Sequence, residues 1–593
     1  MGLKNLLFDL QSIKSAYLEG MSPSTLLDEV HRRIKLADEN PIWIYLLNES
    51  ELAPYLDNLK KADISRLPLY GVPFAIKDNI DLQGVTTTAA CPEFSYEADR
   101  SAFVVEQFVD AGAIPIGKTN LDQFATGLVG TRSPYGAVRN SFSPKLISGG
   151  SSSGSAVAVA LGQVSFALGT DTAGSGRVPA ALNNLVGYKP TFGIISCGGV
   201  VPACRTLDCV SFLTNHVADA QSLAAQAIKF DPTDSYSRRY IPRTKASLTI
   251  GLPKPEDCDF SGNNDYKNLF DDLVAKLKAE YATVNVDIAP QLVTAELLYN
   301  GPWVAERFHA ARKLLENRPD ALRDEFKISV ASAPKYSAVD YFNAEYQLAD
   351  YRRVTKELFE TIDALVLPTV SNHFSIAEVD AEPIRSNNQN GKYTNFVNLL
   401  DLAAIAIPGG FTANGLPFGI SLIGPAMSDA LLMQLAQKIL ANQTSREFGA
   451  SGLKLHEPEL RPMQQEAIPL AVCGAHLTGM PLNHQLTDRH AEFREVTVTS
   501  QNYRLYKLAG GPPLRPGLVR TTDGVSIEVE VWDVPKTEIG SFLAEIPAPL
   551  GLGKVELESG EWVSGFICEA IGVEQAIDVS IFGGWRTFLN SIE

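Results

Sequence analysis

The chain has 593 residues, of which 45% are hydrophobic and 20% are charged, a composition that is ordinary for a globular protein with a normal core. Its formal net charge of −17 argues against nucleic acid or an anionic membrane as the main partner, because both require a basic face. The sequence contains neither the apolar stretch of a signal peptide nor a run near the ~18 apolar residues of a membrane span, so we expect a cytoplasmic protein.

The first 65 residues are predicted to form packed helices. Ser22 followed by Pro23 is typical of a helix N-cap and of the first helical position. Apolar side chains then recur at helical spacing, at Leu26, Leu27, Val30 and Ile34. We expect these helices to belong to a large first domain that covers residues 1–460.

Between residues 69 and 425, strand-like apolar runs alternate with helical segments. The predicted strands lie at 113–118, 164–171, 248–253, 364–369 and 419–424, and the predicted helices at 102–112, 155–163, 265–281 and 337–359. This alternation predicts an α/β fold in which a mixed β-sheet is covered by helices on both faces.

The last part of the chain has a different pattern. A polar, proline-bearing stretch indicates a domain boundary, with a linker at 461–470. Beyond it, residues 525–531 alternate between valine or isoleucine and polar side chains, as in a strand whose polar face meets water. A hairpin turn is predicted near Gly560. Residues 471–593 are therefore predicted to form a small, strand-rich α+β domain.

Three segments carry residue types that suit a serine hydrolase. Lys77 follows an apolar run, Ser151 lies in GGSSSGSA, and Ser175 lies in GTDTAGSGRVPA. Taken singly, they are typical of a surface lysine, a flexible linker and a turn. Together they indicate chemistry, because a glycine-rich loop that enters a helix exposes N–H groups, and burial favours a neutral lysine that acts as a base. No histidine lies between His31 and His216, and a serine activated by lysine needs none.

A competing motif overlaps the glycine-rich loop. Residues 150–154 match GxSxG, with Ser152 as the nucleophile. A nucleophile elbow should follow a buried strand, whereas the preceding RNSFSPKLISGG is polar and rich in turns. We interpret this match as accidental.

In this order, and with spacings of 74 and 24 positions, the three segments resemble the amidase signature family over roughly residues 20–450. VLPT at 366–369 and GLPFGISLIG at 415–424 belong to the same resemblance. The resemblance implies an amidase signature fold in which Ser175 is the nucleophile, Ser151 relays protons from a cis peptide bond, and Lys77 is the general base. It also implies an oxyanion hole built from the backbone N–H groups of Thr172, Ala173, Gly174 and Ser175.

The segment LLYNGPWVAERF bears on the substrate. Tyr299 and Arg307 are eight residues apart, about two helical turns, and are predicted to face the same side of one helix. Arginine can bind a carboxylate in a bidentate fork, although a helix-face cation beside a packed aromatic is the commoner arrangement. The segment resembles the allophanate hydrolase branch of the family. That resemblance implies that both residues grip the carboxylate of allophanate, that the backbone near Gly127 touches the substrate, and that no metal or organic cofactor is needed.

The C-terminal region resembles, over its whole length, the C-terminal domain of allophanate hydrolases, which has a γ-glutamylcyclotransferase-like fold. The resemblance implies decarboxylation of N-carboxycarbamate, with His476 as the preferred participant and His484 as a weaker one. These histidines and His490 lack the spacing of a known metal site, so we predict none. The alternative is a passive oligomerisation module.

Other functions remain open at this point. Another amidase, such as the amidotransferase that modifies charged tRNA, would fit the first domain, but the acidic charge and the C-terminal domain argue against it. A binding protein on an amidase scaffold would be expected to lack a catalytic residue. The resemblance also predicts a homodimer and a functional link to a separate biotin-dependent urea carboxylase.

Overall fold

The computed structural model describes residues 5–37, 39–64, 66–243, 245, 247–443, 446–455, 467–489, 491–536 and 538–592. The chain divides into two compact units, Met1–Arg461 and Pro462–Glu593, which we call unit 1 and unit 2. The expected linker at 461–470 begins outside the described residues, and its last four residues already belong to the first strand of unit 2. No helix in the described part of the chain is long and apolar enough to cross a membrane.

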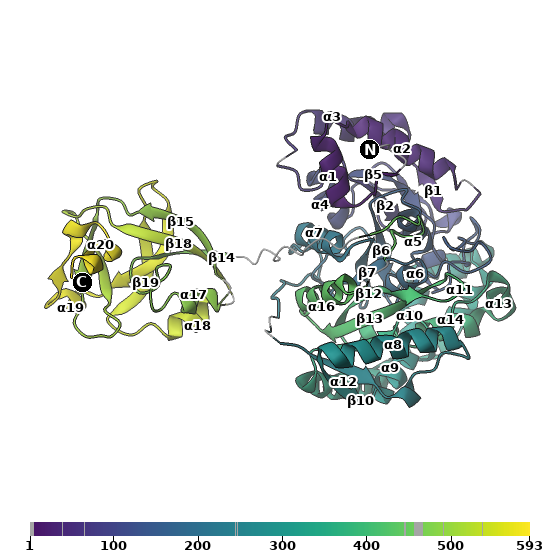
Figure 1. The fold of residues 1–593 in the computed structure, drawn as a ribbon. Coiled ribbons are helices and arrows are strands. Elements are labelled where there is room, and N and C mark those ends of the chain that lie inside the picture. The colour runs from purple at the N-terminus through teal and green to yellow at the C-terminus, as the bar shows by residue number, and fades with distance from the viewer. Residues whose placement is uncertain are drawn as a thin grey trace. The chain divides into compact units, whose positions relative to one another are not determined.

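Unit 1 is built on one 11-stranded mixed sheet (Figure 1). In order across the sheet, the strands are β1 (Trp43–Leu46), β5 (Ile114–Thr119), β2 (Pro73–Lys77), β6 (Phe166–Asp171), β8 (Cys209–Thr214), β7 (Val186–Lys189), β12 (Leu402–Phe411), β13 (Pro417–Pro425), β11 (Ala364–Pro368), β9 (Thr249–Pro253) and β10 (Ala282–Val286). Pairing is parallel from β5 through β2 to β6 and from β11 through β9 to β10, and antiparallel elsewhere. The predicted mixed sheet is confirmed, and each strand predicted from an apolar run occurs in it.

Helices cover both faces of this sheet. Figure 1 places α5 (Ser153–Ala160) and α6 (Arg177–Leu182) on one side of the central strands and α7 (Val217–Ala227) and α16 (Asp429–Ala441) on the other. The other helices described in unit 1 are α1 (Leu10–Leu18), α2 (Pro23–Lys35), α3 (Glu49–Lys60), α4 (Phe103–Asp110), α8 (Asn264–Glu280), α9 (Ala289–Asn300), α10 (Val304–Asn317), α11 (Asp324–Val330), α12 (Ala338–Thr361), α13 (Ile376–Ala381), α14 (Pro383–Gly391) and α15 (Phe396–Leu399).

Two glycines allow α6 to lie directly on the sheet. A Cβ atom on Gly187 of β7 would lie 2.5 Å from the Cβ of Ala180, and one on Gly419 of β13 would lie 2.5 Å from the Cβ of Ala181. Such separations are far below normal carbon–carbon contact, so larger residues on these strands would push the helix away. The loop that precedes α6, which contains Ser175, is thereby fixed against the core.

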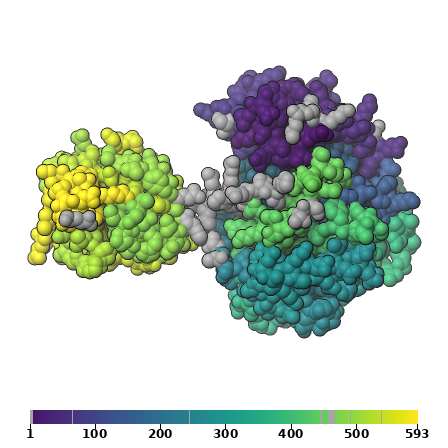
Figure 2. Space-filling view, in the orientation of Figure 1, coloured from purple at the N-terminus to yellow at the C-terminus, as the bar shows by residue number. Residues whose placement is uncertain are grey.

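The N-terminal helices follow the sequence prediction closely. The Ser22 side chain accepts a hydrogen bond from the N–H of Thr25, and Pro23 is the first residue of α2. Strand β1 was not predicted, because a four-residue edge strand carries too little alternation to be recognised. In Figure 2 the N-terminal residues and the residues near 260–360 gather at opposite ends of unit 1.

Unit 2 is a strand-rich α+β domain. Its 5-stranded sheet has the order β15 (Glu492–Val498), β18 (Glu528–Pro535), β14 (Ala467–Val472), β20 (Trp562–Cys568) and β19 (Leu550–Glu556), and a 3-stranded sheet contains β17 (Pro516–Arg520), β16 (Tyr503–Lys507) and β21 (Ile577–Asp578). Short helices complete it: α17 (His484–Thr487), α18 (Ile539–Ala544), α19 (Ala570–Val573) and α20 (Trp585–Asn590). The predicted hairpin joins β19 to β20.

In the predicted alternation at 525–531, Ile527, Val529 and Val531 are buried as predicted, but two other residues differ. Val525 is 43% exposed, whereas Glu530 is only 2% exposed. The Glu530 carboxylate tolerates burial because it accepts hydrogen bonds from the N–H and hydroxyl of Thr478, from the indole of Trp532 and from Arg586. Tertiary partners therefore buried a side chain that the local pattern placed in water.

Candidate active site

Lys77 is the last residue of β2 and is completely buried. Its amine lies 2.7 Å from the hydroxyl oxygen of Ser151 and 2.7 Å from that of Thr170 on β6, and it donates to both. The parallel pairing of β2 with β6 brings Lys77 and Thr170 together, because their side chains lie at the carboxyl ends of neighbouring strands.

The charge state of Lys77 follows from its surroundings. Burial lowers the pKa of the Lys77 amine to about 7, against the opposing pull of the carboxylates of Asp122, Asp208 and Asp171. A substantial fraction of the amine is therefore neutral near pH 7 and able to accept a proton.

Ser151 lies in the glycine-rich loop before α5, after a cis peptide bond to Gly150, and is buried. Its carbonyl oxygen accepts from the N–H of Asp122 at 3.2 Å, which ties the loop to the segment after β5. The neighbouring Ser152 is the N-cap of α5, and its hydroxyl donates to the carbonyl of Thr170 at 3.2 Å. Ser152 thus has a structural contact of its own, distinct from the amine of Lys77.

Ser175 approaches this loop from the other side. Its carbonyl oxygen accepts from the N–H of Ser152 at 3.3 Å, so its backbone lies beside the residue that follows Ser151. Its hydroxyl donates to the carbonyl of Gly127 at 3.4 Å, and among the described residues it forms no hydrogen bond with Ser151. The three predicted residues are gathered in one place, but the hydroxyl of Ser175 is directed to Gly127.

The expected oxyanion donors are not all free. The N–H of Gly174 donates to the carboxylate of Asp171 at 2.8 Å. In the described part of the chain, the N–H groups of Thr172, Ala173 and Ser175 have no protein acceptor. Gly174 has a φ of +130°, and its backbone turns the amide toward the carboxylate instead of toward the nucleophile.

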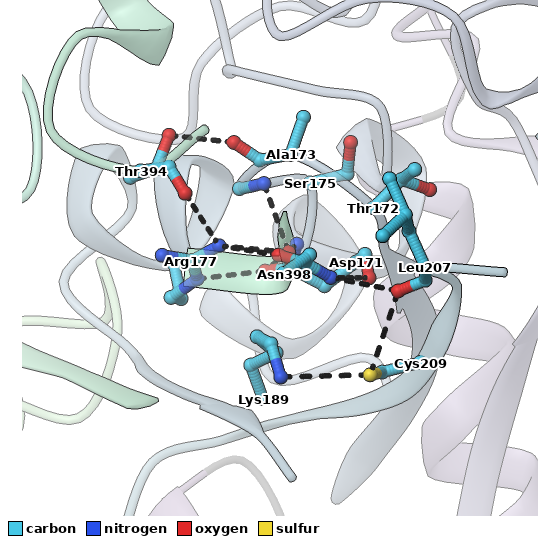
Figure 3. A network of polar contacts seen from close by, with 12 residues as sticks. Asp171, Thr172, Ala173, Ser175, Arg177, Lys189, Leu207, Cys209, Thr394 and Asn398 are labelled. Carbon is cyan, nitrogen blue, oxygen red and sulfur yellow. Dashed lines mark hydrogen bonds and ion pairs between the residues drawn. The ribbon is translucent and has the colours of Figure 1, made fainter. Parts of the chain in front are cut away.

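A buried ion pair supports the nucleophile loop (Figure 3). The guanidinium of Arg177 contacts both carboxylate oxygens of Asp171 at 2.9 Å, and neither side chain is exposed. Arg177 also donates to the carbonyl of Thr394 and to the side chain of Asn398, whose amide donates to the carbonyls of Asp171 and Leu207. The Nη1 of Arg177 has no hydrogen-bond partner among the described residues, whereas Nε and Nη2 are both bonded. Bidentate geometry and these further bonds help to make a buried pair tolerable.

Tyr299 and Arg307 do not share a helix as predicted. Tyr299 lies in α9 and Arg307 in α10, because the chain breaks between them at Gly301 and Pro302, where proline cannot continue a helix. The two side chains nevertheless meet, with the guanidinium carbon 4.9 Å from the centre of the tyrosine ring.

The guanidinium of Arg307 is buried and only partly satisfied. Its Nη1 donates to the hydroxyl of Thr126 at 3.2 Å, whereas Nε and Nη2 have no hydrogen-bond partner among the described residues. Thr126 precedes Gly127, whose carbonyl receives the hydroxyl of Ser175. The loop that contains Thr126 and Gly127 therefore contacts both the hydroxyl of Ser175 and the buried guanidinium of Arg307.

Comparisons with known proteins agree with this geometry. The family model described as Amidase matches residues 25–433, and the model described as Allophanate hydrolase C-terminal domain matches residues 468–590. The chain belongs to the amidase family. We therefore call unit 1 the amidase unit and unit 2 the C-terminal domain.

Relatives extend over both parts. The chain is 45% identical to the Urea amidolyase of Lachancea kluyveri over 94% of its own length and 32% of that protein, so it spans about a third of that relative. It is 44% identical to the Urea amidolyase of Saccharomyces cerevisiae, over 96% of this chain and 32% of that one. A solved structure of Kluyveromyces lactis Allophanate Hydrolase matches with 43% identity and a TM-score of 0.79, covering 99% of both chains.

The amidase unit contains functional residues that sequence reasoning missed. Arg132 is buried, and its guanidinium donates to the carbonyls of Thr126 and Pro383, so two arginines hold Thr126. Burial raises the pKa of Asp208 to about 6; its carboxylate accepts from the hydroxyl of Thr172 and interacts electrostatically with Arg307. Neither residue was predicted from the sequence, since Pro383 and Thr172, which they contact, lie 251 and 36 positions away along the chain.

In the C-terminal domain, His476 lies at the edge of a cavity of about 320 Å³. Its ring stacks on Phe566 with centroids 4.9 Å apart, meets Phe542 edge-on, and places Nε2 2.8 Å from the side-chain oxygen of Gln485. Burial lowers the pKa of this histidine. His484 is exposed and does not line the cavity, and His490 lies outside the described residues.

The Asp171–Arg177 pair yields a stability prediction. Replacing Arg177 with Met should lower the free energy of unfolding of the amidase unit by about 3–5 kcal/mol, because it leaves a buried carboxylate without its counter-ion. Urea denaturation followed by circular dichroism measures this. Arg353→Met, which removes an exposed i, i+4 pair with Glu357, is the control and should cost below about 0.5 kcal/mol. Equal losses in the two variants would contradict the structural role of the buried pair.

Proposed function

We propose that this protein hydrolyses allophanate, releasing ammonia through a serine acyl-enzyme. The observation that carries the proposal is the open fork of Arg307, whose Nε and Nη2 are buried without partners among the described residues, on the same loop that contacts Ser175. A buried guanidinium is stable only with an anion, and a planar fork suits a carboxylate bonded to both nitrogens. Allophanate is a small planar amide that carries one carboxylate.

The proton path begins at Lys77. Neutral Lys77 takes the proton of Ser151, and Ser151 takes that of Ser175, whose oxygen attacks the terminal amide carbon. For this the hydroxyl of Ser175 turns from Gly127 toward Ser151, a change of one side-chain torsion. The proton then returns through the same hydroxyl to the leaving nitrogen, which departs as ammonia. Water attacks the resulting acyl-enzyme and releases N-carboxycarbamate, restoring Ser175.

The tetrahedral oxyanion is stabilised by backbone amides. We assign this role to the N–H groups of Thr172, Ala173 and Ser175, which have no protein acceptor in the described part of the chain. The N–H of Gly174 serves instead to hold the loop on Asp171. In comparable sites, removing one such donor costs about 3–4 kcal/mol of transition-state stabilisation.

The C-terminal domain is proposed to decarboxylate N-carboxycarbamate. The C–N bond breaks, its electron pair stays on nitrogen, carbon dioxide leaves, and the nitrogen takes up a proton. His476, held by Gln485 and two phenylalanine rings, is the proposed participant in this proton transfer. A urea carboxylase is the proposed source of allophanate, in line with the relatives named urea amidolyase. Homodimer formation and a cytoplasmic location stay predictions.

The nucleophile assignment is tested by substitution. Ser175→Ala should lower kcat for ammonia release from allophanate by at least ~10⁴-fold with the fold retained, because no other hydroxyl can form the acyl-enzyme. Ser152→Ala should lose far less, since the hydrogen bonds of its hydroxyl are to the backbone carbonyl and N–H of Thr170. The reverse order of effects would favour the GxSxG alternative.

The pH profile tests the state of Lys77. Since the deprotonated amine is the base and its pKa lies at about 7, kcat/KM should rise with pH through a midpoint at about 7 and level off about one pH unit above it. The measurement is initial ammonia release between about pH 5 and 10. A rising limb centred near pH 10, the ordinary range of lysine, would show that the amine is not held neutral.

Substrate recognition is tested at Arg307. Arg307→Gln should lower kcat/KM for allophanate by about 100-fold but that for malonamide by much less, because only allophanate carries the carboxylate. Arg312→Gln, on the exposed side of the same helix, is the matched control. Equal losses on both substrates would remove carboxylate binding from the role of Arg307.

A further inference from the structure

The cavity of the C-terminal domain is lined by an arginine, Arg515, to which the proposed decarboxylation gives no role. Its lining contains three ionisable side chains of interest, His476, Arg515 and Glu545. Glu545 is already neutralised by Arg489, with 2.6 Å between the charged groups. Arg515 forms no ion pair and no side-chain hydrogen bond with any residue that the structure describes. Burial lowers the pKa of His476, so Arg515 is the cation of this lining that lacks a carboxylate partner among the described residues.

The backbone places Arg515 beside the loop that follows β14. The carbonyl of Arg515 accepts from the N–H of Leu508 at 3.0 Å, which closes the loop between them. The next residue, Pro516, packs against Gly474 in the loop that follows β14. A Cβ atom on Gly474 would lie 2.3 Å from the proline ring. Gly474 and Pro516 both line the cavity, so Arg515 borders it at a position fixed by backbone packing.

The same loop offers further donors for an anion. Gly474, Ala475 and His476 line the cavity in succession, and within the described residues their N–H groups donate to no protein acceptor. Residues 474–476 form a bend and turn, and successive backbone amides in turn conformations can bind an anion. A guanidinium beside such amides binds a carboxylate more strongly than either group does alone.

Apart from Gln485, the rest of the lining is largely apolar. Ile546, Leu550 and Phe566 form part of it. Ligand pockets span about 300–1,000 Å³, so a cavity of about 320 Å³ suits a small molecule and excludes a peptide or a polymer. Such a cavity fits an occupant that carries negative charge at one end and tolerates loss of water at the other.

We propose that Arg515 is the specificity-determining cation of this cavity and that it binds one carboxylate of a small dianion with two carboxylates. This inference rests on the proposed function, in which that dianion is N-carboxycarbamate. Arg515 and the amides of 474–476 hold the carboxylate that stays, and the second carboxylate lies toward the apolar wall, from which it leaves as neutral carbon dioxide. Loss of water around a carboxylate favours its conversion to a neutral product.

Binding of a stable dianion tests the site. Malonate has the skeleton of N-carboxycarbamate with a methylene in place of the N–H, and it does not decarboxylate under assay conditions. The full chain carrying Arg307→Gln, which weakens any competing carboxylate site in the amidase unit, is titrated with malonate by calorimetry. Adding Arg515→Gln should weaken binding at least tenfold, and adding Arg515→Lys should weaken it less. Adding Arg520→Gln, whose partner Glu556 lies outside the cavity, should leave it unchanged.

Turnover separates the two proposals. With ¹³C-labelled allophanate, the Arg515→Gln chain should accumulate more N-carboxycarbamate per ammonia first released than the parent or Arg520→Gln chains. Unchanged malonate affinity in a folded Arg515→Gln chain would overturn the role of Arg515. Weakened malonate binding with unchanged decay of N-carboxycarbamate would uphold the anion site and instead contradict decarboxylation in this domain.

Discussion

The amidase unit depends on keeping an amine out of water. Lys77 ends a strand within an 11-stranded sheet, and its only polar contacts in the described structure are the hydroxyls of Ser151 and Thr170. Removing a lysine from water disfavours its charged form, and this turns a residue that is normally cationic into a base. The glycine-rich loop, the nucleophile loop and the close packing of α6 all serve to bring hydroxyls to this one buried nitrogen.

The carboxylates around the site connect loop structure to this chemistry. Asp122 accepts from three amides of the loop at 129–132, Asp171 from the amides of the nucleophile loop, and Asp208 from the amides of the 203–204 turn. Each carboxylate holds a loop that has no regular structure of its own. The same three charges raise the pKa of Lys77 against its burial, so a pKa of about 7 is the balance of the two effects. Loop order and base strength therefore cannot be changed independently.

Arginine is used in two opposite ways in this acidic protein. Arg177 is bound by its carboxylate partner and neighbouring carbonyls, and it stabilises the fold. Arg307 keeps two buried N–H groups without partners in the described structure, which places unsatisfied positive charge where a ligand is expected. The difference lies in whether the protein itself supplies the anion, and it distinguishes a structural cation from a binding one.

The sequence alone determined the elements with strong local signals: the strands β5, β6, β9, β11 and β13, the capped helix at Pro23, and the three segments that contain Lys77, Ser151 and Ser175. Those signals are local because apolar runs, caps and glycine-rich loops act within a few residues. Only the tertiary structure decided what depends on distant partners. It buried Glu530, placed Tyr299 and Arg307 on separate helices that meet again, and directed the amide of Gly174 to Asp171. Burial and most side-chain hydrogen bonds are set by residues that lie far away along the chain, and no local pattern encodes them.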